Sequence, residues 1–200
     1  MSYPVTFEAD YLERRSRPTA FFRLILAIPL GIWAYLYGIV AGIAIVIAWL
    51  AVVITGRMPL ALYEFVAGFT RFLTRVIAYT ALLTDSYPSF GGGDDPVYPV
   101  RMSFAGPLDR YSRAKAFFRL ILAIPLMVLR YVMQLLLEFG AFAAWFVIVI
   151  TGRMPRGLFD PMVLASSYIA RSDSYLFLLT ETYPPFQDEQ TRAAGLDASA

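Results

Sequence analysis

Two long apolar runs dominate the chain, at residues 24–54 and at the corresponding positions of its second half. The first run contains 31 residues without a charged side chain. A helix that crosses a membrane needs about 20 apolar residues, because the hydrocarbon core is about 30 Å thick. At about 1.5 Å per residue the run would reach about 46 Å. It is therefore too long for one upright helix and short for two complete spans.

Two topologies fit a run of this length. Each run is either one strongly tilted helix or a helical hairpin that turns near residues 35–42. Basic residues stand on both sides of each run, and basic residues favour the cytoplasmic side of a membrane. Gly38 and Gly42 lie in the middle of the first run, where glycine suits a bend. Both observations favour the hairpin, with both ends of each run on the cytoplasmic side.

The pattern of apolar and polar residues occurs twice along the chain. Three motifs return 96 residues later: AFFRLILAIPL at 20–30 and 116–126, VITGRMP at 53–59 and 149–155, and LLTDSYPSF at 82–90, which becomes LLTETYPPF at 178–186. The chain is therefore predicted to consist of two tandem copies of one membrane-embedded unit.

This duplication divides the chain into four segments. We assign membrane repeat 1 to residues 1–90, a Gly/Asp linker to 91–97, membrane repeat 2 to 98–186 and a disordered tail to 187–200. The tail is polar and rich in alanine, and terminal segments of this kind are commonly disordered.

Short segments around each apolar run predict further elements. Residues 3–10 alternate weakly between apolar and polar, as a strand does, and residues 98–104 are their second copy. These two segments either pair with each other or form irregular polar connectors. In the TGRMP motif, glycine predicts a left-handed helix cap and proline predicts the start of the next helix.

A second helix is predicted in each repeat, at residues 60–83 in the first copy. Its polar residues recur every three or four positions and share one face: Glu64, Gly68, Arg71 and Arg75. Such an amphipathic helix is expected to lie along the membrane interface, and packing within a helical bundle is the alternative. The predicted fold class is an all-α membrane protein of two tandem repeats. Each repeat has a long apolar helical hairpin or tilted span plus an interfacial amphipathic helix, and short possible β-strands precede each repeat.

Composition excludes a water-soluble globule and several catalytic chemistries. Hydrophobic residues make up 58% of the chain and charged residues 16%, against about 25% charged residues in soluble domains. Lipid must therefore cover part of the surface. The chain has no cysteine or histidine, which excludes disulfides, His-containing metal sites and Ser-His-Asp catalysis. The net charge of +2 is too small to suggest nucleic acid as a partner.

Polar residues within and beside the apolar runs are the candidates for function. Arg130, Gln134 and Glu138 interrupt the second run at its middle and form the candidate polar membrane site. A charge is costly in hydrocarbon, so it marks a transport path, caps a bend or pairs with another element. The candidate lipid-headgroup contacts are Arg23, Arg57, Arg75, Arg119, Arg153 and Arg171.

The sequence resembles an uncharacterised family of bacterial membrane proteins that is common in actinobacteria. The resemblance rests on RLILAIP before an apolar run, TGRMP after it and LLTDSYP after the following helix, and it covers residues 3–90 and 98–186. Members of that family carry this unit once or in tandem, and their domain has no known function. The resemblance therefore implies a membrane location and no particular catalytic or binding residue.

These observations predict an integral membrane protein that is not an enzyme, with no catalytic residue, cofactor or metal site. We expect an accessory or scaffold protein of the cytoplasmic membrane, multi-pass or re-entrant, with its polar segments in the cytoplasm. The expected partners are the lipid bilayer, anionic lipids included, and either another membrane protein or a second copy of the chain. The alternative is a small two-repeat transporter or channel that uses Arg130 and Glu138.

Overall fold

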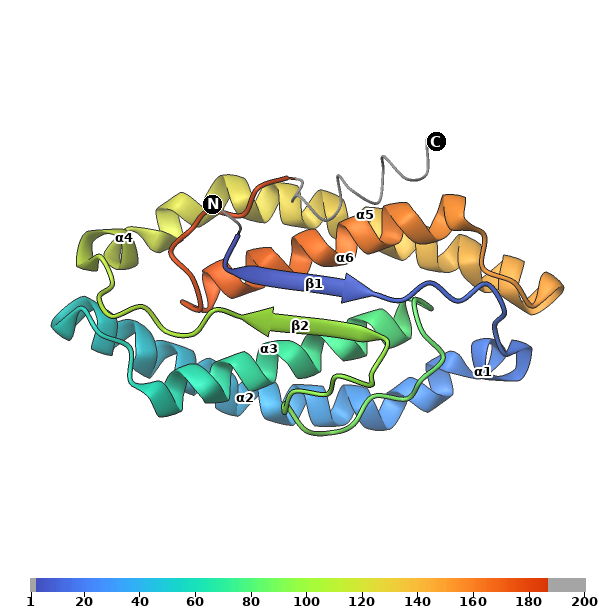
Figure 1. Ribbon diagram of the computed structural model, residues 1–200, viewed down its shortest axis with the longest axis horizontal. Coiled ribbons are helices and arrows are strands. Elements are labelled where there is room, and N and C mark those ends of the chain that lie inside the picture. Colours follow the sequence, from blue (N-terminus) through green and yellow to red (C-terminus); the bar gives the residue numbers. More distant parts are fainter. Residues whose placement is uncertain (1–2, 187–200) are drawn as a thin grey trace.

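The computed structural model describes residues 3–186, so the predicted disordered tail at 187–200 lies outside the described residues. Each repeat contributes one strand, one short helix and two longer helices (Figure 1). The first repeat contains β1 (Val5–Ala9), α1 (Arg17–Phe21), α2 (Arg23–Thr55) and α3 (Leu60–Thr80). The second contains β2 (Val100–Phe104), α4 (Arg113–Phe117), α5 (Arg119–Thr151) and α6 (Arg156–Leu176).

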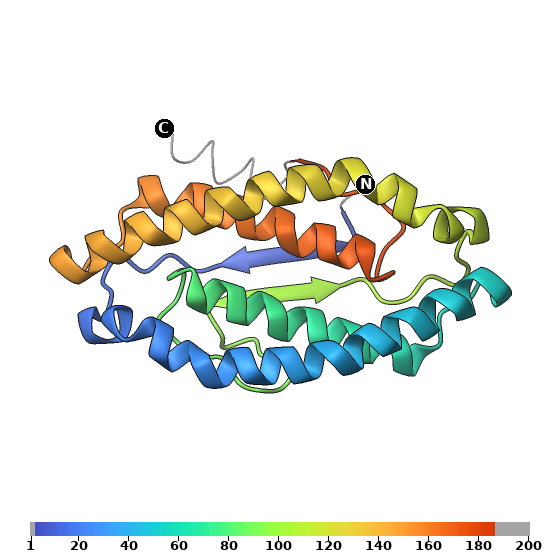
Figure 2. The ribbon, with the colours of Figure 1, turned by 180° about the vertical axis from the view of Figure 1, so that it is seen from behind.

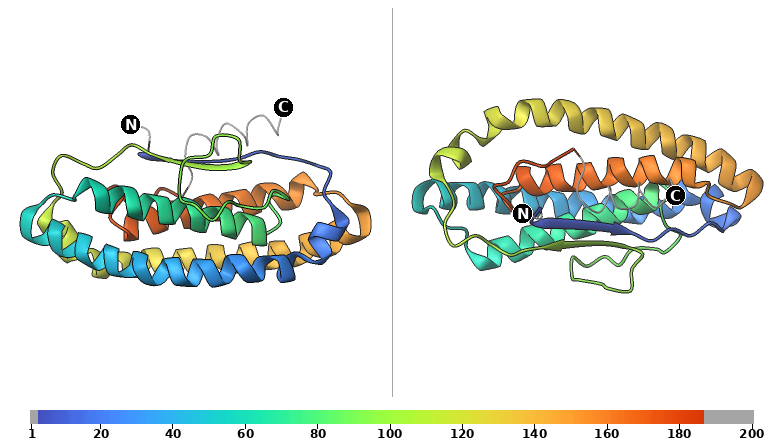
Figure 3. Two further views of the ribbon diagram at one scale, coloured as in Figure 1. Left: turned by 90° about the horizontal axis from the view of Figure 1, so that it is seen from below. Right: turned by 45° about the horizontal axis from the view of Figure 1, so that its top comes forward.

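These elements form three layers (Figure 3). The two strands lie on one face, α3 and α6 lie beneath them, and α2 and α5 form the opposite face. Seen from behind, α5 and α2 run along the two long sides of the molecule (Figure 2). The prediction of a mostly helical protein with two repeats, each with a long apolar helix and a short strand before it, is confirmed.

β1 and β2 pair as an antiparallel ribbon, so the two weak strand signals are confirmed. Phe7 lies directly opposite Met102, and these residues occupy equivalent positions of the two repeats. A pseudo-twofold axis therefore passes between them, perpendicular to the ribbon. Successive side chains of a strand point to opposite faces, which buries Phe7 and Met102 in the shared core and leaves Glu8 exposed.

The predicted hairpin in each apolar run is wrong. α2 and α5 are each one continuous helix of 33 residues, and both pass straight through the region where a bend was expected. A bend in apolar surroundings leaves backbone groups unpaired at a cost of several kcal/mol each, whereas glycine in a helix costs only about 1 kcal/mol. Gly38 instead lies within the continuous helix at its contact with α3, where a Cβ would meet the ring of Phe69 at an ordinary packing distance of 3.7 Å.

α3 and α6 pack inside the protein, which was the alternative to the predicted interfacial position (Figure 3). The polar face of α3 contacts the strand layer and the linker. Arg71 Nε donates to Met102 O at 3.2 Å, and Arg75 Nη2 donates to Gly93 O at 2.7 Å. A polar stripe has the same spacing whether it faces solvent or a neighbouring backbone. The expectation that this stripe faces lipid headgroups or water is therefore wrong, because other segments of the protein cover it.

The two repeats interlock at both ends of the molecule. Gly56 and Gly152 have a φ of +71°, which is the left-handed cap predicted from TGRMP. Gly56 O accepts a hydrogen bond from Tyr111 N at 2.8 Å, and Gly152 O accepts one from Arg15 N at 2.9 Å. Each cap therefore binds the segment that precedes the first helix of the other repeat, so the two halves form one folded body.

Replacing Gly152 with alanine should destabilise the protein by about 1–2 kcal/mol, because a side chain is strained in the left-handed conformation. The new Cβ would also lie 3.0 Å from Arg17 Nε. Gly31→Ala is the matched control, since Gly31 is helical and a Cβ there meets no described atom within 4 Å. The free energy of unfolding in detergent micelles measures both changes, and equal effects would contradict this role of Gly152.

Candidate functional site

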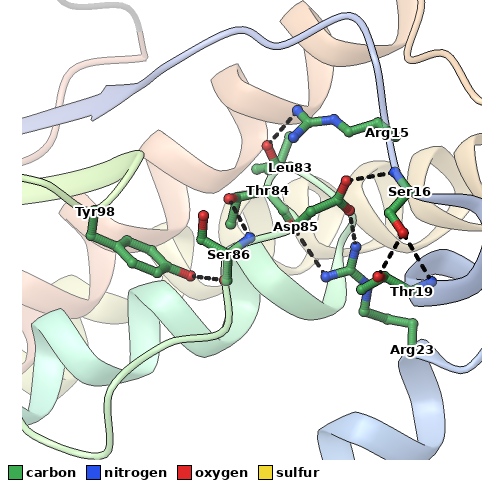
Figure 4. A network of polar contacts seen from close by, with 9 residues as sticks. All are labelled: Arg15, Ser16, Thr19, Arg23, Leu83, Thr84, Asp85, Ser86 and Tyr98. Carbon is green, nitrogen blue, oxygen red and sulfur yellow. Dashed lines mark hydrogen bonds and ion pairs between the residues drawn. The ribbon is translucent and has the colours of Figure 1, made fainter.

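A buried arginine cluster joins the motifs that open and close each repeat, and Figure 4 shows the cluster of repeat 1. In repeat 1, Arg23 is 2% exposed and forms an ion pair of 2.6 Å with Asp85. Its other terminal nitrogen donates to Thr84 O at 2.9 Å, and its guanidinium carbon lies 4.1 Å from the centre of the Tyr79 ring. The RLILAIP and LLTDSYP motifs thus contact each other, because Arg23 of the first binds Thr84 and Asp85 of the second.

Asp85 also positions the start of α1. Its second carboxylate oxygen accepts a hydrogen bond from Ser16 N at 2.8 Å, and Ser16 Oγ accepts one from Thr19 N, as a helix N-cap does. Arg15 donates to Leu83 O at 2.7 Å. Burial lowers the pKa of Arg15, while the Asp85 carboxylate acts in the opposite direction. One carboxylate therefore holds the beginnings of both α1 and α2.

The turn that presents these carbonyl groups has a strained backbone. Leu82 has a φ of +63°, and its equivalent Leu178 has a φ of +66°. A residue with a side chain costs about 1–2 kcal/mol in this conformation. The turn is held by complete burial of Leu83 and by the hydrogen bonds to the carbonyl oxygens of Leu83 and Thr84. The LLT part of the motif thus presents the carbonyl oxygens of Leu83 and Thr84 as acceptors for the buried Arg15 and Arg23.

The second repeat builds the same cluster with different partners. Arg119 is 3% exposed and donates to the carbonyl oxygens of Tyr175 and Thr180. Glu181, which stands where the first repeat has aspartate, accepts a hydrogen bond from Ser112 N at 2.6 Å. The glutamate therefore keeps the cap on α4, while backbone carbonyl groups bind the arginine.

A tyrosine from the strand layer completes each cluster. Tyr98, just before β2, donates to Ser86 O at 2.9 Å in the first repeat. Tyr3, just before β1, donates to Thr182 O at 3.3 Å in the second. Burial raises the pKa of both tyrosines, so their hydroxyl groups stay protonated and donate. In these contacts, side chains bind backbone carbonyl groups, backbone amides and opposite charges. Each cluster therefore has a structural role, which is to hold the first and last motifs of a repeat together.

Four of the six predicted lipid-headgroup contacts are buried, so the prediction is wrong for them. The exposed fractions are 2% for Arg23, 3% for Arg75, 3% for Arg119 and 0% for Arg171. A position near an apolar run does not distinguish an arginine that faces lipid from one that packs inside the protein. Arg57 and Arg153 are exposed beside the TGRMP caps, and for them headgroup contact stays a prediction.

The structure divides the candidate polar membrane site into two contacts. Arg130 forms a bidentate ion pair with Asp173 of α6. Its Nε lies 2.7 Å from Oδ1 and its Nη2 lies 3.2 Å from Oδ2. Gln134 donates to Glu138 at 2.9 Å, and Glu138 is exposed. Arg130 therefore pairs with another element, which is one of the predicted alternatives for a charge at this depth.

Asp173 was not among the predicted site residues, although the two repeats contain a signal for it. The positions equivalent to Arg130 and Asp173 are Ala34 and Ile77. Both positions are charged in one repeat and both are apolar in the other, and a paired change of this kind indicates contact. Asp173 is 4% exposed, so its charge depends on Arg130 for compensation.

Two helices are long and apolar enough to cross a membrane. These are α2, with a mean hydropathy of 2.7, and residues Ile121–Thr151 of α5, with a mean hydropathy of 2.0. Among residues 3–186, no group of three or more His, Cys, Asp or Glu side chains could hold a metal ion. The length and hydropathy of the two helices are thus compatible with a membrane protein.

Comparison with known families agrees with the duplicated architecture. The family described as Domain of unknown function (DUF4389) matches the chain twice, at residues 17–91 and 113–187. No curated protein and no solved structure matches the chain. The two matched segments begin at α1 and at α4, so β1 and β2 precede the family unit in each repeat. Since the two matches cover most of the sequence, the chain belongs to this family of unknown function, in tandem form.

Proposed function

We propose that the protein is a non-enzymatic accessory or scaffold protein embedded in the cytoplasmic membrane. The observation that carries the proposal is the distribution of exposed large apolar side chains. They concentrate on α2 and α5, with exposed fractions of 79% at Leu24, 71% at Phe139 and 70% at Ile150. Apolar surface of this extent marks contact with a membrane or with another protein.

The opposite face of the molecule suits an aqueous environment. On the ribbon, Arg101 forms ion pairs with Asp10 at 2.8 Å and with Glu8 at 3.3 Å. The two carboxylate side chains are 56% and 54% exposed. One side of the fold therefore matches lipid, and the other offers the charged surface on which a scaffold protein contacts its partners.

The contacts of Arg130 support this proposal over the alternative of a transporter or channel. A transport path needs polar groups that converge on a passage through the membrane. Arg130 instead binds Asp173, and Glu138 binds Gln134 at the exposed surface of α5. The first repeat has neither charge of the ion pair. The pair therefore supports packing of α5 on α6.

The protein should remain with the membranes after a high-salt wash and after an alkaline carbonate wash. The apolar surface of α2 and α5 stays in lipid under both conditions, because its burial depends on the hydrophobic effect. A protein held at the surface by charge is released by salt, which screens that attraction. Recovery of the chain in the soluble fraction would contradict the embedded assignment.

Vesicles distinguish the scaffold from the transporter. Purified protein reconstituted into vesicles that contain a pH- or potassium-sensitive dye should leave an imposed ion gradient intact, while an added ionophore collapses it. The double variant Arg130→Ala/Asp173→Ile is the matched control. A gradient that collapses with the natural chain and persists with this variant would favour the transporter.

A further inference from the structure

We propose that the protein lies in the cytoplasmic leaflet alone, with α2 and α5 parallel to the membrane plane and the β-ribbon facing the cytoplasm. This proposal rests on the membrane residence proposed above and adds an orientation to it. The partner is one leaflet of a bilayer that contains anionic headgroups. Three features carry the proposal: the length of the long helices, the place of the ribbon charges and the symmetry of the exposed cations.

The long helices do not fit a transmembrane orientation. α2 has 33 residues and is about 50 Å long at about 1.5 Å per residue, whereas the hydrocarbon core is about 30 Å thick. To match that thickness the helix would tilt by about 53°, outside the range of roughly 0–40° for membrane helices. Lying flat removes the mismatch, because a helix diameter of about 10–12 Å fits within half the core, about 15 Å.

The charges of the ribbon exclude hydrocarbon from its side of the molecule. The pseudo-twofold axis passes between Phe7 and Met102, so the ribbon lies at the middle of the long dimension (Figure 1). A transmembrane orientation would place the exposed carboxylates of Glu8 and Asp10 near the bilayer centre. A charged side chain is energetically unfavourable there. The flat orientation turns the ribbon toward water, since the ribbon and the long helices form opposite faces (Figure 3).

The two ends of the molecule each carry four exposed cations, and three of the four at each end occupy equivalent positions of the two repeats. One end has Arg14, Arg17, Arg153 and Arg156, and the other has Arg57, Arg110, Arg113 and Lys115. The contacts between repeats bring these residues together. Arg14 forms a strand bridge with Arg153, and the Cβ position of Gly152 lies 3.0 Å from Arg17 Nε. One carboxylate, Glu13, lies 3.6 Å from Arg153 at this end.

This symmetry favours an orientation in which both ends face the same compartment. Basic residues concentrate on the cytoplasmic side of membrane proteins. A transmembrane orientation would place one group of cations on the opposite side. A flat orientation places both groups at headgroup depth on the cytoplasmic leaflet, where anionic lipids attract arginine and lysine.

The flat orientation also explains the observation that favoured a hairpin. Basic residues flank both ends of each apolar run, and this pattern predicts that both ends lie on one side of the membrane. A straight helix satisfies the same condition when it lies in the plane of the membrane. In this orientation, a continuous helix such as α2 or α5 is therefore compatible with basic residues at both of its ends.

Cysteine labelling tests the orientation, since the chain has no cysteine of its own. Three single variants place a thiol at exposed positions: Arg57→Cys and Arg153→Cys at the two ends, and Ser103→Cys on the ribbon. In intact cells all three should resist a membrane-impermeant maleimide, and all three should react once the cells are opened. Ile39→Cys, on the exposed apolar side of α2, is the control for a thiol in lipid and should stay unlabelled throughout.

Each other outcome overturns the proposal in a distinct way. Labelling of only one of the two ends in intact cells means a transmembrane orientation. A Ser103→Cys thiol that stays unlabelled in opened cells, while both ends react, places the ribbon in lipid. Labelling of all three variants in intact cells excludes the cytoplasmic leaflet.

A carbonate wash of each variant separates the orientation from membrane residence. A chain that leaves the membranes contradicts the proposed function itself. A chain that stays with the membranes and shows its two ends on opposite sides contradicts the orientation alone.

Discussion

Asp173→Ile should lower the free energy of unfolding by about 3–5 kcal/mol, because it leaves the Arg130 guanidinium without its partner between α5 and α6. The two side chains are joined by two hydrogen bonds, and they are 31% and 5% exposed. Arg130→Ala should also be strongly destabilising, since it leaves a carboxylate that is almost completely buried.

The double variant Arg130→Ala/Asp173→Ile should recover most of the lost stability. It gives the second repeat the residues that the first repeat has at these positions, Ala34 and Ile77. Replacement of a buried ion pair by apolar residues is often neutral or stabilising, whereas removal of one partner is not. The double-mutant cycle should therefore give a coupling energy close to the sum of the losses of the two single variants.

Titration of a denaturing detergent into mild-detergent micelles, followed by circular dichroism, measures all four members of this cycle. The natural chain and the double variant should unfold at similar concentrations, and each single variant should unfold earlier. Additive effects of the two substitutions would mean that the two residues do not depend on each other, contrary to the observed ion pair.

Asp85→Ala should cost about 3 kcal/mol, since it leaves Arg23 without its counter-ion and removes the acceptor for Ser16 N. Asp85 is 22% exposed, so water compensates part of the loss. The matched variant of the second repeat, Glu181→Ala, should cost only about 1 kcal/mol. Glu181 binds Ser112 N, while Arg119 keeps its hydrogen bonds to backbone carbonyl groups.

The same detergent titration compares these two variants directly. Asp85→Asn distinguishes the two roles of the carboxylate, because asparagine keeps an oxygen for Ser16 N and loses the charge that faces Arg23. Its effect should lie between those of the natural residue and alanine. Equal costs for Asp85→Ala and Glu181→Ala would contradict the different partners of the two arginines.

The local signals of the sequence determined the repeated units and many of their boundaries. A duplicated motif is visible without any knowledge of contacts. A long run of apolar residues predicts a helix whose surface is mostly shielded from water. Gly56 and Gly152 were predicted as left-handed caps, because glycine is favoured where a helix ends and the chain turns. The weak alternation at both strands was sufficient to suggest their pairing.

The tertiary structure decided what these elements contact. Whether the chain bends at Gly38 or continues as a helix depends on its packing against α3, where Phe69 faces this position, and local spacing does not specify that neighbour. Arg75 lies on a polar stripe in either environment, and the linker carbonyl of Gly93 satisfies it inside the protein. Arg130 required the distant Asp173. In each case a contact between segments far apart in the chain replaces water or lipid, and periodicity within one segment carries no information about that partner.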